Sequence, residues 1–194
     1  ILGLSALPTS HPQNMGMVGM HGNYAPNLLT NECDLLIAVG MRFDDRVTGD
    51  LGTYAKQAKI IHLEIDPAEI NKNVPVDLAV LGNCKSSLQQ LLPLVSKKDL
   101  SPWYQRFEAL KATEINKVIN NDLYPTKPGL TMGEAIKVIN KHSGGDAIIV
   151  TDVGQHQMVA CRYAEFNQSK SNVTSGGLGT MGFALPAAIG AKMG

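Results

Sequence analysis

Short apolar runs bounded by glycine, proline or acidic residues recur along the chain and predict buried strands. Four runs are clear, at residues 34–39, 59–65, 76–80 and 146–150. Strands of a parallel sheet are covered on both faces and therefore read as continuous apolar runs. Because segments of helix length separate several of these runs, right-handed crossovers are expected. The pattern predicts an α/β fold with parallel sheets.

Helical periodicity and capping signals predict further elements. We expect helices over residues 23–32, 84–95, 101–121 and 130–142, a short strand over 172–174, and a last helix that runs towards residue 194. In the second helix, Leu88, Leu91, Leu92 and Val95 fall on one face. The third helix opens with Ser101-Pro102, a good N-cap followed by proline in the first turn, and its apolar side carries Trp103, Phe107, Leu110, Ile115 and Val118.

Polar and proline-containing stretches predict the domain bounds. Residues 96–101 are polar, and Pro125 and Pro128 bracket an extended linker. We expect one domain over 1–97, a helical linker over 98–128, and a second domain over 129–194. The second domain is expected to be truncated, because it has one convincing strand before Val173 and stops while still helical.

Composition excludes several classes of function. The 17 basic and 17 acidic residues cancel, which disfavours nucleic acid as the main partner. The sequence contains no run of about 18 apolar residues, which is the length needed to span a bilayer. Its three widely spaced cysteines fit neither a zinc knuckle nor a disulfide framework. These features are typical of a cytoplasmic protein, although the chain starts at Ile1 rather than at methionine.

Two segments of the first half can carry ligand chemistry. The glycine-rich stretch 16–22 precedes a helix, where backbone N–H groups suit phosphate oxygens; a loop that only needs positive φ would look the same. Arg42 and Arg46, alternating with Asp44 and Asp45 directly after a strand, can clamp a diphosphate or carboxylate. The alternative for this cluster is a set of surface salt bridges.

Glu64-Ile65-Asp66 follows the next strand, where a carboxylate commonly holds ribose hydroxyls. The fingerprint G-x-G-x-x-G is absent between a strand and a helix, which disfavours a standard nicotinamide site. His62 lies in the middle of this strand and is interpreted as a packed core residue.

Two segments of the second half are also candidates. Gln155, His156 and Gln157 follow a glycine turn after a strand and could bind a polar cofactor; a plain helix-start turn is the competing interpretation. Residues 175–182 hold four glycines in eight positions, which indicates unusual backbone or close ligand contact. No serine-hydrolase elbow and no H-E-x-x-H zinc motif is present.

In this order, the strings at Gly19–Gly22, Arg42–Gly49, Asp152–Met158 and Ser175–Gly182 closely resemble the catalytic subunit of acetohydroxyacid (acetolactate) synthase. That family uses thiamine diphosphate in branched-chain amino-acid synthesis. The resemblance implies that residues 1–97 form a Rossmann-like (DHS-like) central FAD-binding domain. It also implies that 129–194 are the N-terminal part of the thiamine-diphosphate-binding domain.

The resemblance also implies roles for individual residues. Contacts to FAD would come from Gly19, Met20, His21, Gly22, Gly40, Met41, Arg42, Phe43, Asp44, Glu64, Ile65 and Gly176. Contacts to thiamine diphosphate would come from Gln155, His156, Gly179, Thr180 and Met181, the methionine being the apolar wedge that keeps the cofactor bent. Arg46 matches a position that lines the substrate channel. Two departures from the family are Asn83, where aspartate is usual, and Val159, where tryptophan is common.

The family condenses pyruvate with a second pyruvate or with 2-oxobutyrate, with loss of carbon dioxide. The resemblance therefore implies thiamine diphosphate, Mg²⁺ and FAD as cofactors, a homodimer and a small regulatory subunit. The family's catalytic glutamate and magnesium ligands match nothing in residues 1–194, so the chain is expected to be a fragment that is inactive alone, without catalytic or metal-binding residues. Two alternatives remain: a relative of the glyoxylate carboligase or pyruvate oxidase type, and a non-catalytic flavin- or nucleotide-binding module.

Overall fold

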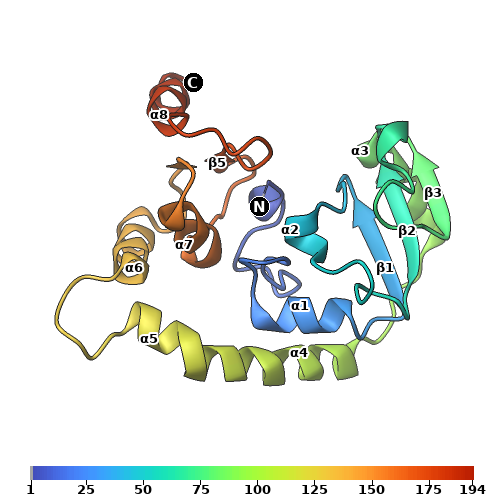
Figure 1. The fold of residues 1–194 in the computed structure, drawn as a ribbon, viewed down its shortest axis with the longest axis horizontal. Coiled ribbons are helices and arrows are strands. Elements are labelled where there is room, and N and C mark those ends of the chain that lie inside the picture. The colour runs from blue at the N-terminus through green and yellow to red at the C-terminus, as the bar shows by residue number, and fades with distance from the viewer. Residues whose placement is uncertain (1) are drawn as a thin grey trace. The chain divides into compact units, whose positions relative to one another are not determined.

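The computed structural model describes residues 2–194, which group into two units (Figure 1). The sheet unit consists of Val18–Met20 and Tyr24–Glu108. The terminal unit consists of residues 2–17, His21–Asn23 and Ala109–Gly194. The boundary falls within one helix, α4 (Ser101–Glu114). The expected domain bounds near residues 97 and 128 stay predictions.

The sheet unit is built on three parallel strands, drawn blue to green in Figure 1. They are β1 (Leu35–Val39), β2 (Lys59–Glu64) and β3 (Leu78–Leu81), in the order β1-β2-β3. The register pairs Ile37 with Ile61 and Ile61 with Leu78. The parallel strands predicted from the apolar runs are confirmed, with ends that differ by one or two residues.

Short helices join these strands. They are α1 (Tyr24–Thr30), α2 (Asp45–Thr48) and α3 (Cys84–Leu91), with 3₁₀ turns at Pro67–Glu69 and Leu92–Leu94. The α-helix predicted over 84–95 ends at Leu91, because Pro93 cannot donate a helical hydrogen bond and the chain tightens into the 3₁₀ turn. No residue of α3 is buried. The core of the unit instead gathers around Ala38, Phe43, Tyr54, Ala55, Ile60 and Val74.

The terminal unit contains the second half of α4, which continues through a π-helical turn (Ile115–Ile119) into α5 (Asn120–Leu123). It then contains α6 (Met132–Ser143), β4 (Ile149–Thr151), α7 (Gln155–Tyr163), β5 (Asn172–Thr174) and α8 (Ala184–Met193). A 3₁₀ turn at Leu4–Ala6 opens the described chain. Strands β4 and β5 are parallel, with Val150 opposite Val173.

Local sequence explains how α6 begins and ends. The Thr131 hydroxyl accepts from the Glu134 N–H group, while the Glu134 carboxylate accepts from the Thr131 N–H group, which is a complete capping box. Gly144 ends the helix in the left-handed conformation. None of the helices in residues 2–194 combines the length and the apolar character needed to cross a membrane.

Candidate functional site

The carboxyl ends of β1 and β2 bring several predicted site residues to one edge of the sheet unit. Residues 40–44 follow β1, and Ile65 follows β2 directly. The ladder extends past the strands, because the Gly40 N–H group donates to the Leu63 carbonyl oxygen at 2.9 Å. Ligands of open α/β sheets bind at this edge, so the predicted site lies where the fold favours one.

The segment after β1 is a tight loop that delivers both arginines. Asp44 caps α2, its carboxylate accepting from the Arg46 N–H group at 3.2 Å. The Arg42 guanidinium lies 3.7 Å from the Asp44 carboxylate, and that of Arg46 lies 3.1 Å from the Asp45 carboxylate. Both guanidiniums remain more than half exposed. The loop and α2 line a cavity of about 330 Å³.

Gly19 and Met20 lie against α2 within the same unit. The Asn27 amide bonds both the N–H group and the carbonyl of Gly19, at 2.7 and 2.9 Å. The Met20 N–H group donates to the Arg46 carbonyl oxygen at 2.7 Å. A Cβ atom on Gly19 would lie 2.6 Å from that same oxygen, and its φ is +103°. Only glycine fits there, and this part of the predicted FAD set lies beside Arg46.

Glu64 is more enclosed than a ribose-binding carboxylate would be expected to be. The residue is 8% exposed, and its Oε1 accepts from the N–H groups of Ile65 and Asp66 at 2.8 and 3.1 Å. Its Oε2 lies 3.7 Å from the Nε2 atom of His62. Ile65 by contrast is exposed. The remaining predicted FAD contacts, His21, Gly22 and Gly176, belong to the terminal unit.

The predicted thiamine diphosphate residues all belong to the terminal unit, beyond the parallel strands β4 and β5. Gln155 and His156 open α7 and are exposed, and Met181 is exposed as well. Asp152 joins the two loops: its Oδ2 accepts from the Gly182 N–H group at 2.9 Å. That hydrogen bond, with smaller contributions from the Val153 and Phe183 N–H groups, lowers the pKa of the Asp152 carboxyl.

The glycine-rich loop is closed by its own first residue. Ser175 accepts from the Gly179 N–H group through its carbonyl oxygen at 2.8 Å, and from the Thr180 N–H group through its hydroxyl at 3.0 Å. Gly179 has φ of +67° and Gly182 has φ of +83°, which explains two of the glycines. The loop therefore holds Met181 outward on a defined turn.

The sequence groups Gln157 with Gln155 and His156 as polar side chains that could bind a cofactor, but Gln157 is buried in the structure. Gln157 is 7% exposed, and its Nε2 donates to the Thr174 hydroxyl at 2.6 Å. The Thr151 hydroxyl donates to the same oxygen at 2.9 Å. This buried network fixes α7 to the ends of β4 and β5. Residues three positions apart lie on the same face of a helix. The position of Gln157, three residues after Gly154, was therefore the sequence signal that its side chain faces the strands.

Within residues 2–194, no cluster of three or more His, Cys, Asp or Glu side chains could hold a metal ion. The three cysteines are free thiols, and burial raises the pKa of Cys33 and Cys161.

Two family models match the chain. The model described as "Thiamine pyrophosphate enzyme, central domain" matches residues 1–91, and that described as "Thiamine pyrophosphate enzyme, C-terminal TPP binding domain" matches residues 152–194. The chain belongs to the thiamine pyrophosphate enzymes. This match confirms the α/β fold class with parallel sheets. It also confirms the family that the four motifs predicted.

Curated relatives of this thiamine pyrophosphate enzyme chain match it along its whole length. It is 44% identical to a probable acetolactate synthase large subunit of Methanocaldococcus jannaschii, over 198 residues. It is 43% identical to the acetolactate synthase large subunit of Lactococcus lactis, and 39% identical to the acetolactate synthase isozyme 3 large subunit of Escherichia coli. All of the chain is covered in each case, against 33, 33 and 34% of the relative. The chain thus spans about a third of the length of these relatives.

Proposed function

We propose that this chain is part of an acetolactate synthase, which decarboxylates pyruvate and condenses it with a second 2-oxo acid, pyruvate or 2-oxobutyrate. The observation that carries the proposal is the match to acetolactate synthase large subunits at 44% identity over the full chain. Three of the four motifs, Arg42–Gly49, Asp152–Met158 and Ser175–Gly182, follow the ends of β1, β4 and β5, and this placement supports it. The proposal includes a central FAD-binding domain over 1–97, a linker over 98–128 and the start of the thiamine diphosphate domain over 129–194.

The residues of the sheet unit fit a flavin nucleotide. Among the described residues, the backbone N–H groups of Met41, Arg42 and Phe43 donate no hydrogen bond. They lie in one loop with the two exposed guanidiniums of Arg42 and Arg46. Free N–H donors and arginines suit phosphate and carbonyl oxygens. We infer that residues 40–44 with Gly19 and Met20 hold part of FAD, and that Ile65 packs on it, with His21, Gly22, Glu64 and Gly176 as further proposed contacts.

The residues of the terminal unit fit the diphosphate half of thiamine diphosphate. Gly154 precedes α7 without a side-chain cap, so the first N–H groups of the helix are left for an anion. Gln155 and His156 add exposed polar groups there. Gly179, Thr180 and Met181 approach from the loop that Asp152 holds, and Met181 offers an apolar surface. When bound, thiamine diphosphate supplies the electron sink for decarboxylation.

Further parts of the proposal concern the complete protein. Mg²⁺ would be held by residues outside this chain, and Arg46 would line the channel through which the 2-oxo acids enter. We infer a homodimer with a small regulatory subunit, in the cytoplasm. The 194 residues alone are expected to produce no acetolactate.

Acetolactate formation from pyruvate by the complete natural protein tests the proposal, with thiamine diphosphate, Mg²⁺ and FAD each omitted in turn. We expect activity to be lost without thiamine diphosphate or Mg²⁺ and reduced without FAD. A glyoxylate-derived product or oxidation of pyruvate would move the protein to a sister family. Flavin binding without any of these reactions would indicate a binding module.

A matched pair of variants tests the site within the same assay. Met181→Ala removes the proposed wedge, whereas Leu178→Ala truncates a side chain of the same loop that is even more exposed, 93 against 78%. We expect the first variant to lower kcat at saturating thiamine diphosphate at least tenfold, because the wedge positions the cofactor for reaction, and the second to leave it unchanged. Equal activities would contradict the role of Met181.

A further inference from the structure

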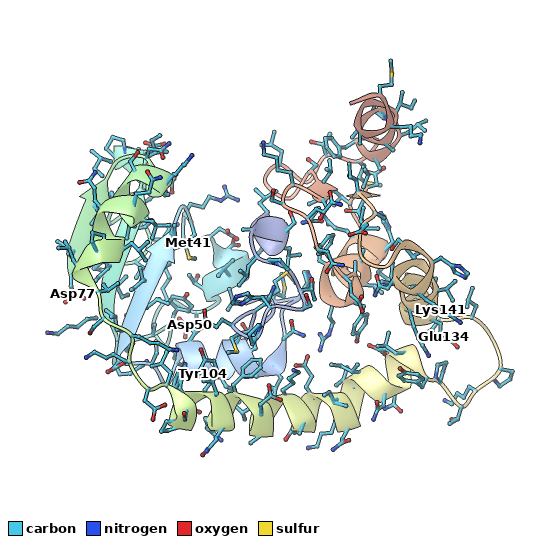
Figure 2. The ribbon with its side chains drawn as sticks, turned by 180° about the vertical axis from the view of Figure 1, so that it is seen from behind. Met41, Asp50, Asp77, Tyr104, Glu134 and Lys141 are labelled. Carbon is cyan, nitrogen blue, oxygen red and sulfur yellow. The ribbon has the colours of Figure 1, made fainter. Side chains whose placement is uncertain are left out.

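Three consecutive carbonyl groups in the loop after β1 are held by two side chains from elsewhere in the sheet unit. The Met41 carbonyl oxygen accepts from the Nε2 atom of His62 at 2.7 Å. The Asn73 amide donates to the carbonyl oxygens of Arg42 and Phe43, at 3.2 and 3.1 Å. Figure 2 labels Met41, which lies just beyond the end of β1. The loop backbone is therefore tied at every residue from 41 to 43.

The hydrogen bond from His62 to the Met41 carbonyl leaves the other ring nitrogen of His62 in an unfavourable environment. His62 is completely buried, and its Nδ1 atom has no hydrogen-bond partner among the described residues. The Met41 carbonyl oxygen can only accept, so Nε2 carries the proton of this bond, while Nδ1 stays buried without a hydrogen bond, which is unfavourable. An aliphatic side chain of similar size would avoid that penalty but could not hold the carbonyl.

Phe43 shows that the loop conformation is enforced. Its φ is +51°, which lies in the left-handed region. This conformation is energetically unfavourable for a residue with a bulky side chain. Strained backbone of this kind persists where its surroundings over-determine it. The Phe43 ring is 2% exposed and meets the His62 ring edge to face, with centroids 5.0 Å apart. The buried ring and the two tethers together hold a shape that the loop would not adopt alone.

The tethers engage only the carbonyl oxygens of this loop. All three carbonyls from 41 to 43 have protein partners, whereas the three N–H groups have none in the described residues. Groups that are fixed before binding lose less entropy when a ligand arrives. A loop prepared in this way suits a ligand rich in acceptor oxygens.

We propose that His62 and Asn73 are positioning residues, which hold the backbone of Met41–Phe43 in the conformation that receives acceptor atoms of the flavin nucleotide. This inference rests on the proposed FAD site and goes beyond it. Neither residue needs to touch the cofactor. They set its affinity and its surroundings through the loop.

Asn73 offers the cleaner experiment because its side chain is exposed. Asn73→Asp keeps the shape but turns a carboxylate oxygen towards the two carbonyls, and Asn73→Ala removes the tether. Gln90→Glu, the same amide-to-acid change on the exposed surface of α3, is the matched control. His62→Gln keeps an N–H donor of similar reach, whereas His62→Leu keeps only the apolar bulk of the side chain.

The measurement is FAD titration of the complete protein, followed by flavin fluorescence and by the visible absorption of the bound flavin. We expect Asn73→Asp and His62→Leu to weaken FAD affinity about tenfold or more, and Asn73→Ala somewhat less. The Asp variant should also shift the bound-flavin spectrum, while its melting temperature without FAD falls by no more than about 4 °C. His62→Gln should restore affinity to within about threefold of wild type.

Two results would overturn the inference. If wild type binds FAD and both Asn73 variants bind it equally well with an unchanged spectrum, the tethers do not position the loop, although the FAD site stands. If wild type binds no FAD, the FAD site of the proposed function fails and the inference fails with it. A loss in His62→Leu that His62→Gln does not rescue would reduce His62 to a packing residue.

Discussion

Removing Arg162 should destabilise the terminal unit far more than its single ion pair would suggest. Arg162, on α7, donates to the carboxylate of Glu114, where α4 passes into the π-helical turn. The Glu114 side chain is 3% exposed and that of Arg162 is 22% exposed. The same cluster reaches the N-terminal segment, because the Asn23 amide donates to Glu114 at 3.3 Å and Arg162 donates to the Gly22 carbonyl at 3.4 Å.

The magnitude follows from which charge is left behind. Arg162→Met leaves the Glu114 carboxylate buried, with the Asn23 amide as a remaining donor. Breaking a buried pair from one side costs about 3–5 kcal/mol, and the retained amide places our expectation at the lower end, about 3 kcal/mol. For a chain of this size, that corresponds to a fall in Tm of roughly 6–12 °C. Glu114→Gln should cost only about 1 kcal/mol, because the partly exposed guanidinium can turn to water.

The decisive comparison is the double variant. Arg162→Met with Glu114→Gln no longer buries a charge, so we expect it to be about 1–2 kcal/mol more stable than Arg162→Met alone. Denaturant unfolding followed by circular dichroism measures all four proteins of this double-mutant cycle. Arg162→Lys serves as the control that keeps the charge but not the planar fork, and should fall between wild type and Met. Additive losses across the cycle would refute the reasoning.

Three further outcomes are expected. Gly19→Ala should cost about 2 kcal/mol in denaturant unfolding, since its Cβ would lie 2.6 Å from a backbone carbonyl oxygen at φ of +103°, whereas Gly3→Ala, with open space around its Cβ, should cost nearly nothing. Because the pKa of Asp152 is lowered, its hydrogen bond to the Gly182 N–H group stabilises the loop fully above pH 3.8, the ordinary aspartate pKa, and is lost as the pH falls through the folded-state pKa. The protection of the Gly182 amide from hydrogen exchange should therefore fall in acid. Asp152→Asn should remove that pH dependence. Burial raises the pKa of Tyr54 to about 12 from 10.0, so its stabilising contribution should be complete below pH 10.0 and lost towards pH 12. Burial also raises the pKa of Tyr163, so a tyrosinate absorbance titration should show two late steps, and Tyr54→Phe should remove the earlier one.

The main elements could be predicted because their signals are local. Apolar runs marked β1 to β4, and Ser101-Pro102 marked the start of α4. The π-helical turn was not predicted. Its sequence signal was the spacing of five residues between Leu110 and Ile115 in the apolar pattern, which is wider than an α-helix gives. The sequence pattern also placed five residues on one apolar side of that helix, of which only Phe107 and Leu110 are buried. A regular α-helical period could not hold across the turn.

The candidate site divides along the same line between local and distant signals. Glycines and charges directly after strands are visible in sequence, because a tight loop at a sheet edge needs them whatever lies around it. The residues that hold those loops are not visible in this way. His62 reaches Met41 across 21 residues, and Asn73 reaches Phe43 across 30. Each looks like an ordinary core or surface residue until the fold brings its partner close. Substitutions at these positions, rather than in the motifs, therefore test whether the loops are held in shape as the structure shows.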